Sequence, residues 1–396
     1  MENPKIRFKG FTKDWEQREF SELYARSSEK NDGSIGMDKN ITVATMQFKN
    51  DVKVSTTEYL KTYYTFKLGD IAFEGHQSKE FRYGRFVEND IGNGIVSHIF
   101  AVFRPIQEYD LYFWKYAINN ETLMQRILAR STKASTMMHD LVTNDFLNET
   151  FLVPSVKEQK QIGAFLNKLD NLITLHQRKC EQTKKLKKYM LQKMFPQNGA
   201  KVPEIRFDGF TYDWEQRKLN EVAEKICVGF VGTCEKFYTD ESGIPMYRTG
   251  NLNGLSLNRD DLKYVTNEFH QHNQKSQLKA GDILIARHGD SGKAVNYENS
   301  EEANCLNIVI IRPDFKKCNY KFLTNCINSP ECQKHIKSLS AGSTQAVINT
   351  SEIEKLGVVI PANIDEQNRI ARYFSTLDHL ITLHQRQHKL HLNMLL

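Results

Sequence analysis

Several features that are common in membrane, secreted and metal-binding proteins are missing from this sequence. The 396 residues include seven cysteines, odd in number and without a Cys-x-x-Cys pair, which argues against a disulfide framework and against a zinc site built on paired thiolates. No apolar run approaches the roughly 18 residues needed to span a bilayer, and no apolar signal segment begins the chain. We therefore expect reduced thiols in a soluble, cytoplasmic protein.

Motifs for catalysis are missing too. The sequence has no Gly-x-x-x-x-Gly-Lys-Ser/Thr phosphate loop and no His-Glu-x-x-His helix. It has no Pro-Pro dipeptide, which excludes the Asn/Asp-Pro-Pro-Tyr/Phe loop of amino-methyltransferases. Glu158-Gln-Lys160 matches part of a nuclease motif, but it stands at a predicted helix start, where an acidic residue complements the helix dipole. We predict no catalytic residues and interpret Gly92 to Gly94 as a turn.

Composition is that of an ordinary globular protein. Apolar residues make up 40% and charged residues 26% of the chain, and the formal net charge is +6. This mild positive excess favours an acidic partner without identifying one. The length is sufficient for two or three domains, each with its own core.

The most informative feature is an internal duplication. The segment Pro4 to Leu23 returns as Pro203 to Val222 with thirteen of twenty positions identical, and Leu-Ile-Thr-Leu-His-Gln-Arg occurs at both 172–178 and 380–386. Whole half-molecules are therefore repeated, not a short solenoid unit. One chain can present two copies of one surface, which suits a target with two half-sites.

Each half shows the same order of signals. The shared opening segment is followed by a mixed region with short β-type runs at 41–46, 95–102 and 307–311. Turn signals at 67–70 and 279–282 precede Ile71 and Ile283, and helical patterns follow at about 112–127 and 322–338. A proline after an apolar run then precedes a long helix.

The two long helices carry a heptad seam. Apolar and small polar residues alternate by four and three along 158–195 and again along 366–395, which is typical of helices that pack together. We expect an antiparallel pair, widened by Leu172, Leu175, Leu380 and Leu383. The predicted seam comprises Ile162, Leu166, Leu169, Ile173, His176, Cys180, Thr183 and Lys187, with Ile370, Phe374, Leu377, Ile381, His384, His388, His391 and Leu395.

The three spaced histidines of the second helix, at 384, 388 and 391, could in principle hold a metal on one helix face. Their counterparts in the first helix are His176, Cys180 and Thr183, and no carboxylate or cysteine stands beside them on their own helix. We interpret them as a polar part of the seam and predict no metal site.

In these paired segments the chain resembles the specificity subunit of type I restriction–modification systems. The resemblance rests on five motifs that recur in the same order: Asp-Trp-Glu-Gln-Arg (14–18, 213–217), Gly-Asp-Ile (69–71, 281–283), Gly-Ser-Thr-Gln (342–345) with the weaker copy Ala-Ser-Thr-Met (134–137), Pro…Glu-Gln…Ile (154–162, 361–370) and Leu-Asp-x-Leu-Ile (169–173, 377–381). It covers essentially the whole chain.

The resemblance implies an α+β fold with two duplicated target recognition domains, joined by two long antiparallel coiled-coil-like helices with pseudo-two-fold symmetry. The domains would span 1–155 and 199–362, and the central and distal helical spacers 156–198 and 363–396. Each domain would read one half of a bipartite double-stranded DNA target. The chain would hold no cofactor and have no activity of its own. It would dock two methyltransferase subunits, which bind S-adenosylmethionine and methylate adenine, and two translocating nuclease subunits.

Sequence reading would fall to polar and basic side chains on loops between strands, because these side chains match base edges and phosphates. Any single one of these residues can instead lie on an ordinary exposed loop that does not contact DNA, and this alternative stays open. The candidates are His76, Gln77, Lys79, Arg82, Arg85, Lys133, Ser135 and Thr136 in the first half, and Tyr247, Arg248, Arg287, His288, Lys293, Ser343, Thr344 and Gln345 in the second.

Two other functions remain open from the sequence. A stand-alone regulator would bind DNA without partners, although no compact helix-turn-helix pattern is present. A pure scaffold would join proteins without reading DNA.

Overall fold

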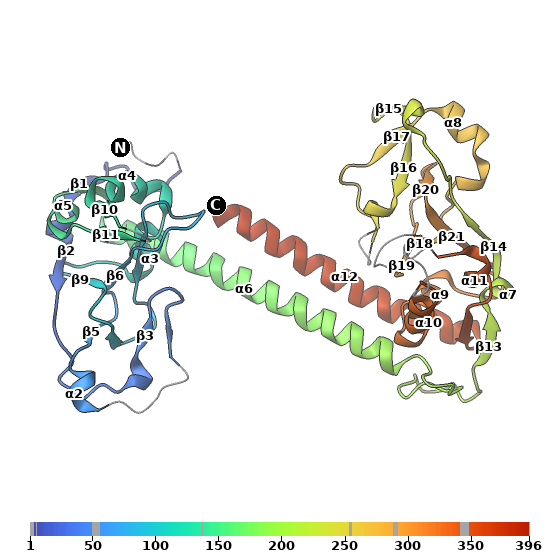
Figure 1. Ribbon diagram of the computed structural model, residues 1–396, viewed down its shortest axis with the longest axis horizontal. Helices are drawn as coiled ribbons and strands as arrows, with labels where there is room; N and C mark the ends of the chain where they lie inside the picture. Colours follow the sequence, from blue (N-terminus) through green and yellow to red (C-terminus); the bar gives the residue numbers. More distant parts are fainter. Residues whose placement is uncertain are drawn as a thin grey trace. The chain divides into compact units, whose positions relative to one another are not determined.

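The computed structural model describes residues 4, 6–49, 56–135, 138–252, 256–287, 292–340 and 348–395 (Figure 1). The chain divides into two compact units, Met1–Thr174 with Leu390–Leu396, and Leu175–Lys389. Both mix helices with largely antiparallel sheets, so the predicted α+β class is confirmed.

The first unit is built on a four-stranded sheet in the order β2-β9-β6-β7, with an apolar cluster on each face. Side chains alternate along a strand, so Ile71 and Phe73 of β6 join α3 and α4 in one cluster, while Ala72 faces β5 and β8 in the other. The strands are β1 (Glu16–Glu19), β2 (Tyr24–Ser27), β3 (Ile41–Thr42), β4 (Gln47–Phe48), β5 (Tyr64–Phe66), β6 (Ile71–Glu74), β7 (Arg85–Glu88), β8 (Gly94–Val96), β9 (Ala101–Pro105), β10 (Thr132–Ala134), β11 (His139–Leu141) and β12 (Thr150–Val153). The helices are α1 (Phe20–Leu23), α2 (Thr57–Leu60), α3 (Leu111–Ile118), α4 (Glu121–Ser131) and α5 (Thr143–Leu147).

The second unit repeats this plan. Its sheet has the order β14-β21-β18-β19, and the strand from each opening segment, β1 or β13, pairs antiparallel with the strand before the long helix, β12 or β22. The strands are β13 (Glu215–Lys218), β14 (Ala223–Val228), β15 (Tyr238–Thr239), β16 (Ile244–Arg248), β17 (Lys263–Val265), β18 (Ile283–Ala286), β19 (Ala294–Asn296), β20 (Asn304–Leu306), β21 (Ile308–Pro313) and β22 (Gly357–Ile360). The helices are α7 (Leu219–Val222), α8 (Asn267–His272), α9 (Tyr320–Ile327), α10 (Pro330–Ser340) and α11 (Thr350–Glu354).

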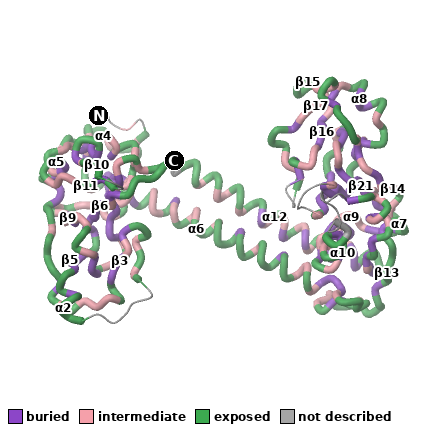
Figure 2. Tube along the Cα trace, viewed as in Figure 1, coloured by how far each residue is buried: buried purple, intermediate pink, exposed green. Residues whose placement is uncertain are grey.

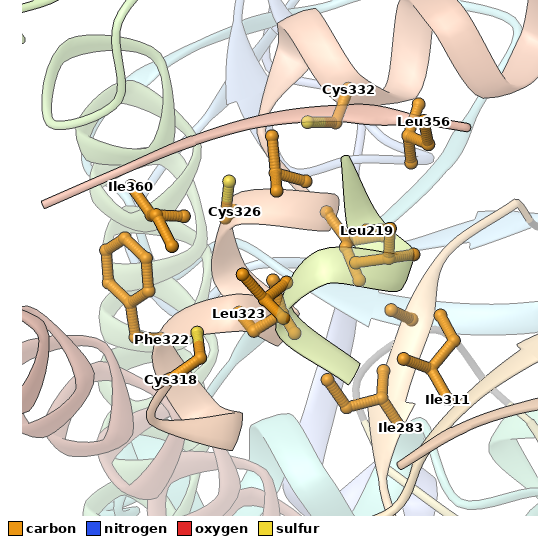
Figure 3. Packing of buried hydrophobic residues seen from close by; sticks show 14 of the residues in the cluster. Leu219, Ile283, Ile311, Cys318, Phe322, Leu323, Cys326, Cys332, Leu356 and Ile360 are labelled. Atoms are coloured by element: carbon orange, nitrogen blue, oxygen red, sulfur yellow. The ribbon is translucent and has the colours of Figure 1, made fainter. Parts of the chain in front are cut away.

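The main core of the second unit lies between this sheet and α9. Phe322, Leu323 and Cys326 of α9 point into the cluster that Ile283 and Ile311 enter from the sheet (Figure 3). All seven cysteines are free and buried, as small apolar side chains often are.

Two predicted helices and one predicted strand are divided in the structure. The pattern at 112–127 forms α3 and α4, because the Asn120 side chain caps a new helix by accepting from the Leu123 N–H. The pattern at 322–338 forms α9 and α10, which starts at Pro330, a residue suited to a first helical turn. The run 95–102 forms β8 and β9, separated by a turn in which the Phe100 N–H donates to the Ser97 carbonyl. Only Ile41 and Thr42 of the run 41–46 are strand.

The repeated Ile-Arg-Phe motif anchors the start of each long helix. Arg7 donates through Nε and Nη2 to both oxygens of Glu158, at 2.9 and 2.8 Å, and Arg206 does the same to Glu366, at 2.7 and 2.8 Å. Both glutamates are buried in the first helical turn. Such two-pronged pairs fix geometry, which explains why the motif is present twice.

The predicted Gly-Asp turns are confirmed in both halves. Asp70 accepts from the Lys67 N–H at 2.8 Å and Asp282 from the Lys279 N–H at 2.7 Å. Each buried carboxylate also pairs with an arginine of a neighbouring strand, Arg104 of β9 or Arg312 of β21. Both turns place glycine at positive φ, 86° at Gly69 and 91° at Gly281, where other residues are strained.

The long helices are α6 (Val156–Lys193) and α12 (Ile364–Leu395). Within the second unit they run antiparallel, because contacts later in α6 meet positions earlier in α12: His176 Nδ1 lies 3.2 Å from His384 Nδ1, and Lys187 Nζ donates to Asp378 at 2.6 Å. The predicted antiparallel packing is thereby confirmed for this part of the pair. Away from the seam the helix surfaces are largely exposed (Figure 2).

The seam differs from the prediction in two respects. Ile370, Phe374 and Leu377 of α12 belong to the core cluster of the second unit, so this part of the stripe also covers the domain. Leu175 and Leu383 do not widen the seam, because they are 43% and 40% exposed. Equivalent leucines in the two repeats thus stay at the surface.

One residue of the first unit is buried at a cost to stability. Glu88, on β7, is 2% exposed, and neither carboxylate oxygen has a hydrogen-bond partner among the described residues. Burial raises the pKa of Glu88 well above its ordinary value, and Asp90 and Asp110 raise it further. Asn296 occupies the corresponding register in the second half, since Glu88 pairs with Ile71 and Asn296 with Ile283.

We therefore expect Glu88→Asn or Glu88→Gln to stabilise the protein at neutral pH. Below the pKa that this carboxyl has in the unfolded chain, it is protonated in both states, and its full contribution to stability is present. As the pH rises toward the raised pKa of the folded protein, the unfolded chain releases this proton while the folded chain keeps it, so stability is lost. The advantage of the variant should grow from pH 5 to pH 8, by at most about 1.4 kcal/mol per pH unit. Urea unfolding at several pH values measures it. Glu80→Gln, at an exposed site, is the control, and a pH-independent difference would contradict the account.

Candidate nucleic-acid interface

In the first half, the segment after β6 lies against the hairpin formed by β10 and β11. His76 and Met138 form an antiparallel bridge, and the His139 N–H donates to the Gly75 carbonyl at 2.8 Å. A Cβ on Gly75 would lie 2.1 Å from the His139 carbonyl oxygen, so this close approach requires glycine. The fold thereby brings together two loops that are about 60 residues apart in the sequence.

Most of the predicted side chains on these two segments are accessible. The exposed residues are His76, Gln77, Lys79, Arg82, Lys133 and Ser135. The Arg82 guanidinium lies 5.6 Å from the Tyr83 ring centre, and Gln77 Nε2 lies 2.6 Å from His139 Nε2. Thr136 lies outside the described residues. This group of exposed cations and amides is named the first loop surface.

Arg85 is engaged elsewhere. Its guanidinium donates to Glu74 at 2.8 Å and to the Ala44 carbonyl at 2.8 Å, and it packs over the Phe81 ring. These contacts link β7 to β6 and to the segment at Ala44, so the structure gives Arg85 a role in holding β6 and β7.

In the second half, three segments meet where their strands end. β16 ends at Arg248 beside the end of β20, and β18 ends at Ala286 beside Ile308, the first residue of β21. The Thr249 hydroxyl donates to the carbonyl of the intervening Asn307 at 3.5 Å. The Ile348 N–H then donates to the Arg287 carbonyl at 3.1 Å, which ties in the chain after α10. The first half has the same arrangement: there the segment after β6 meets the segment that follows α4, and here the segment after β18 meets the segment that follows α10.

The accessible predicted residues here are fewer. Lys293 is exposed, and Arg287 is partly exposed with no hydrogen-bond partner for its Nε among the described residues. Arg248 donates to the Asp261 carboxylate at 2.9 Å, which holds it on its own sheet. His288, Ser343, Thr344 and Gln345 lie outside the described residues. Arg287 and Lys293 define the second loop surface.

Tyr247 is not at this surface. It is fully buried, lies 5.7 Å from the Tyr297 ring and accepts a hydrogen bond from the Asn299 amide at 3.3 Å. Burial raises the pKa of its hydroxyl. β16 is buried on both faces, because Met246 and Tyr247 point in opposite directions and both are fully buried, each in a different apolar cluster. Tyr247 was predicted to lie at the surface because it precedes Arg248 at the end of the strand.

The same two-part organisation appears when the chain is compared with known proteins. The model of the "Type I restriction modification DNA specificity domain" matches twice, at residues 12–185 and 212–393. The matches take in most of the chain, including both loop surfaces. The chain belongs to this family.

Relatives of the family resemble the chain at moderate identity. The specificity subunit of the type I restriction enzyme MjaVIII from Methanocaldococcus jannaschii is 26% identical over 70% of this chain, and that of EcoBI from Escherichia coli is 22% identical over 61%. The matches span 65% and 54% of the lengths of these two relatives.

Solved structures show the fold of the family. The S subunit of a type I restriction–modification system from M. genitalium is 15% identical with a TM-score of 0.63, over 99% of this chain and 96% of that one. A chain from a study of complex assembly and conformational transition of the type I R-M system is 16% identical with a TM-score of 0.51, over 98% of this chain and 96% of that one.

No helix within the described ranges is long and apolar enough to cross a membrane.

The sequence did not identify two residues that lie behind the first loop surface. His139 and Thr132 stand behind Gln77, with His139 Nδ1 3.3 Å from the Thr132 hydroxyl. Neither lies in a repeated motif. Only the pairing of β10 with β11, which places these residues near each other, brings them to the site.

Proposed function

We propose that this chain is the DNA sequence-specificity subunit of a type I restriction–modification complex. Each half reads one part of a bipartite double-stranded DNA target through its loop surface, and α6 and α12 set the separation of the two parts. At about 1.5 Å per residue, α6 is about 57 Å long, more than one turn of duplex DNA at about 34 Å. The subunit works in the cytoplasm, where the DNA is.

The observation that carries this proposal is the repeated loop arrangement. In both halves a segment after the central strand, β6 or β18, is fixed against the chain that follows the second helix, α4 or α10. Exposed lysine, arginine and glutamine side chains suit phosphates and base edges. The side chains differ between the halves, so we expect the two half-sites to differ in sequence.

Catalysis belongs to partner subunits in this proposal. Two methyltransferase subunits bind S-adenosylmethionine and methylate adenine, two nuclease–translocase subunits cut unmodified DNA, and this chain holds no cofactor. The exposed Leu175 and Leu383 support docking of two like partners, because they occupy the same position in the repeated Leu-Ile-Thr-Leu-His-Gln-Arg motif. Leu383 also lines a cleft of about 620 Å³ in the second unit, together with Lys321 and Arg386.

Co-purification with a methyltransferase subunit, followed by methyl transfer from labelled S-adenosylmethionine to DNA, tests this function. We expect no transfer by the chain alone and transfer to specific sites by the complex. Leu175→Asp with Leu383→Asp should weaken the complex at unchanged thermal stability, because both side chains are already exposed, whereas Gln177→Asp with Gln385→Asp should have no effect. Turnover by the isolated chain would refute the non-catalytic role. Specific DNA binding by the chain without partners would favour a stand-alone regulator. Formation of the complex without any DNA binding would favour a scaffold.

A further inference from the structure

A chain of hydrogen bonds runs from the surface residue Gln77 into the first unit. Gln77 Nε2 lies 2.6 Å from His139 Nε2. On the other side of the ring, His139 Nδ1 lies 3.3 Å from Thr132 Oγ1, and Thr132 Oγ1 lies 2.6 Å from the Leu128 carbonyl oxygen. Gln77 is exposed, whereas His139 is only 8% exposed.

The direction of each hydrogen bond follows from its far end. A carbonyl oxygen can only accept, so the Thr132 hydroxyl donates its single proton to Leu128. Thr132 Oγ1 must then accept from His139, which places the proton of the neutral imidazole on Nδ1. Nε2 of His139 is therefore an acceptor, and the Gln77 amide must turn an N–H toward it.

This chain of hydrogen bonds, from Gln77 through His139 and Thr132 to Leu128, forms a relay that holds the Gln77 amide in one orientation. The His139 ring is fixed by the edge of Tyr83, with ring centres 5.4 Å apart, and by its backbone bond to Gly75. With one N–H bond directed at His139, Gln77 presents its carbonyl oxygen and its second N–H outward. A rotated amide would place its oxygen against the lone pair of His139 Nε2, which is repulsive.

We propose that Gln77 reads one adenine of the first half-site in the major groove, and that His139 and Thr132 are positioning residues that fix this specificity. Adenine offers the N6 donor and the N7 acceptor side by side, which an amide oxygen and an adjacent N–H match in a two-pronged contact. Guanine offers two acceptors there and is excluded by the fixed amide oxygen. This inference rests on the proposed function, since it requires the first loop surface to contact DNA.

The surroundings of Gln77 suit a base contact. Lys79, Arg82 and Lys133 are exposed on the same two segments, where they can contact phosphates on either side of the base. The second half lacks this arrangement in its sequence, because Arg-His-Gly follows β18 at 287–289 where Gly-His-Gln follows β6 at 75–77. The adenine contact is therefore specific to one half-site.

Sequence selection by the assembled methyltransferase complex, on a randomised DNA library, tests the assignment. Gln77→Ala should lower the preference for adenine at one position of one half-site by about 5- to 100-fold, with the rest of the target unchanged. Thr132→Val removes the acceptor of the His139 Nδ1 proton. The proton can then move to Nε2, the Gln77 amide can rotate, and its two N–H bonds face outward. This variant should accept guanine as well as adenine at that position, whereas Thr132→Ser keeps the hydroxyl and should keep adenine.

These outcomes separate the inference from the proposed function. A wild-type complex that selects no bipartite sequence would refute the function itself. Suppose that the wild-type complex selects a bipartite target, and that Gln77→Ala and Thr132→Val both select the same base at every position. That result would overturn the adenine assignment and leave the proposed function intact. Equal relaxation by Thr132→Val and Thr132→Ser would contradict the positioning role of the hydroxyl.

Discussion

Replacing Ile381 with aspartate is expected to destabilise the protein by about 3–5 kcal/mol, because it places an unpaired charge in a packed helix contact. Ile381 is 2% exposed, and its backbone carbonyl lies 4.0 Å from the Cys180 sulfur of α6. Lys187 is already paired with Asp378 and is not available to neutralise the new carboxylate. Urea unfolding of the second unit, followed by circular dichroism, measures the loss.

Gln385→Asp is the matched control for this change. Gln385 is exposed on the same helix one turn later, so the variant introduces the same charge and a similar loss of helix propensity without burial. A change within about 0.5 kcal/mol is expected for it. Equal stability of Ile381→Asp and Gln385→Asp would mean that α6 and α12 do not pack together through Ile381.

The helix pair shows how far a hydrophobic pattern determines structure. Alternation by four and three predicted the contact around His176, Ile381 and His384, because that spacing keeps one face toward a neighbour. It did not show which neighbour would bury each residue, and Ile370 and Phe374 also pack on the core of their own domain. Leu175 and Leu383 were predicted to widen the seam and are exposed. Their apolar character therefore needs an explanation other than the pairing of these two helices.

For the loops, the sequence predicted which segments come together but not which side chains they expose. Polar residue types and turn signals predicted which segments could meet DNA, and both halves bring such segments together. Tyr247 was wrong as a DNA contact because it is fully buried, and Arg85 is ion-paired with Glu74. Both facts depend on neighbours that sequence spacing does not reveal. His139 and Thr132 were missed for the same reason, since a hydrogen-bond relay across a hairpin has no short motif.

Exchanging residues 24–150 for the corresponding segment of another family member is expected to change one half of the recognised DNA sequence completely. The segment contains the whole first loop surface and excludes β13 to β22, which build the second half. It also leaves Val156–Lys193 and Ile364–Leu395 intact, the helices that we propose set the separation of the half-sites. The second half of the target and the length between the halves should therefore persist. The reciprocal exchange of 223–356 is the matched control and should change only the other half.

Methylome sequencing of cells that carry the 24–150 exchange tests the central claim most directly, because it reports every modified site in the genome at once. The account predicts a methylated bipartite motif with one new half, one unchanged half and an unchanged spacer. A motif altered in both halves or in its spacer length would contradict independent reading of the target by the two halves of this chain.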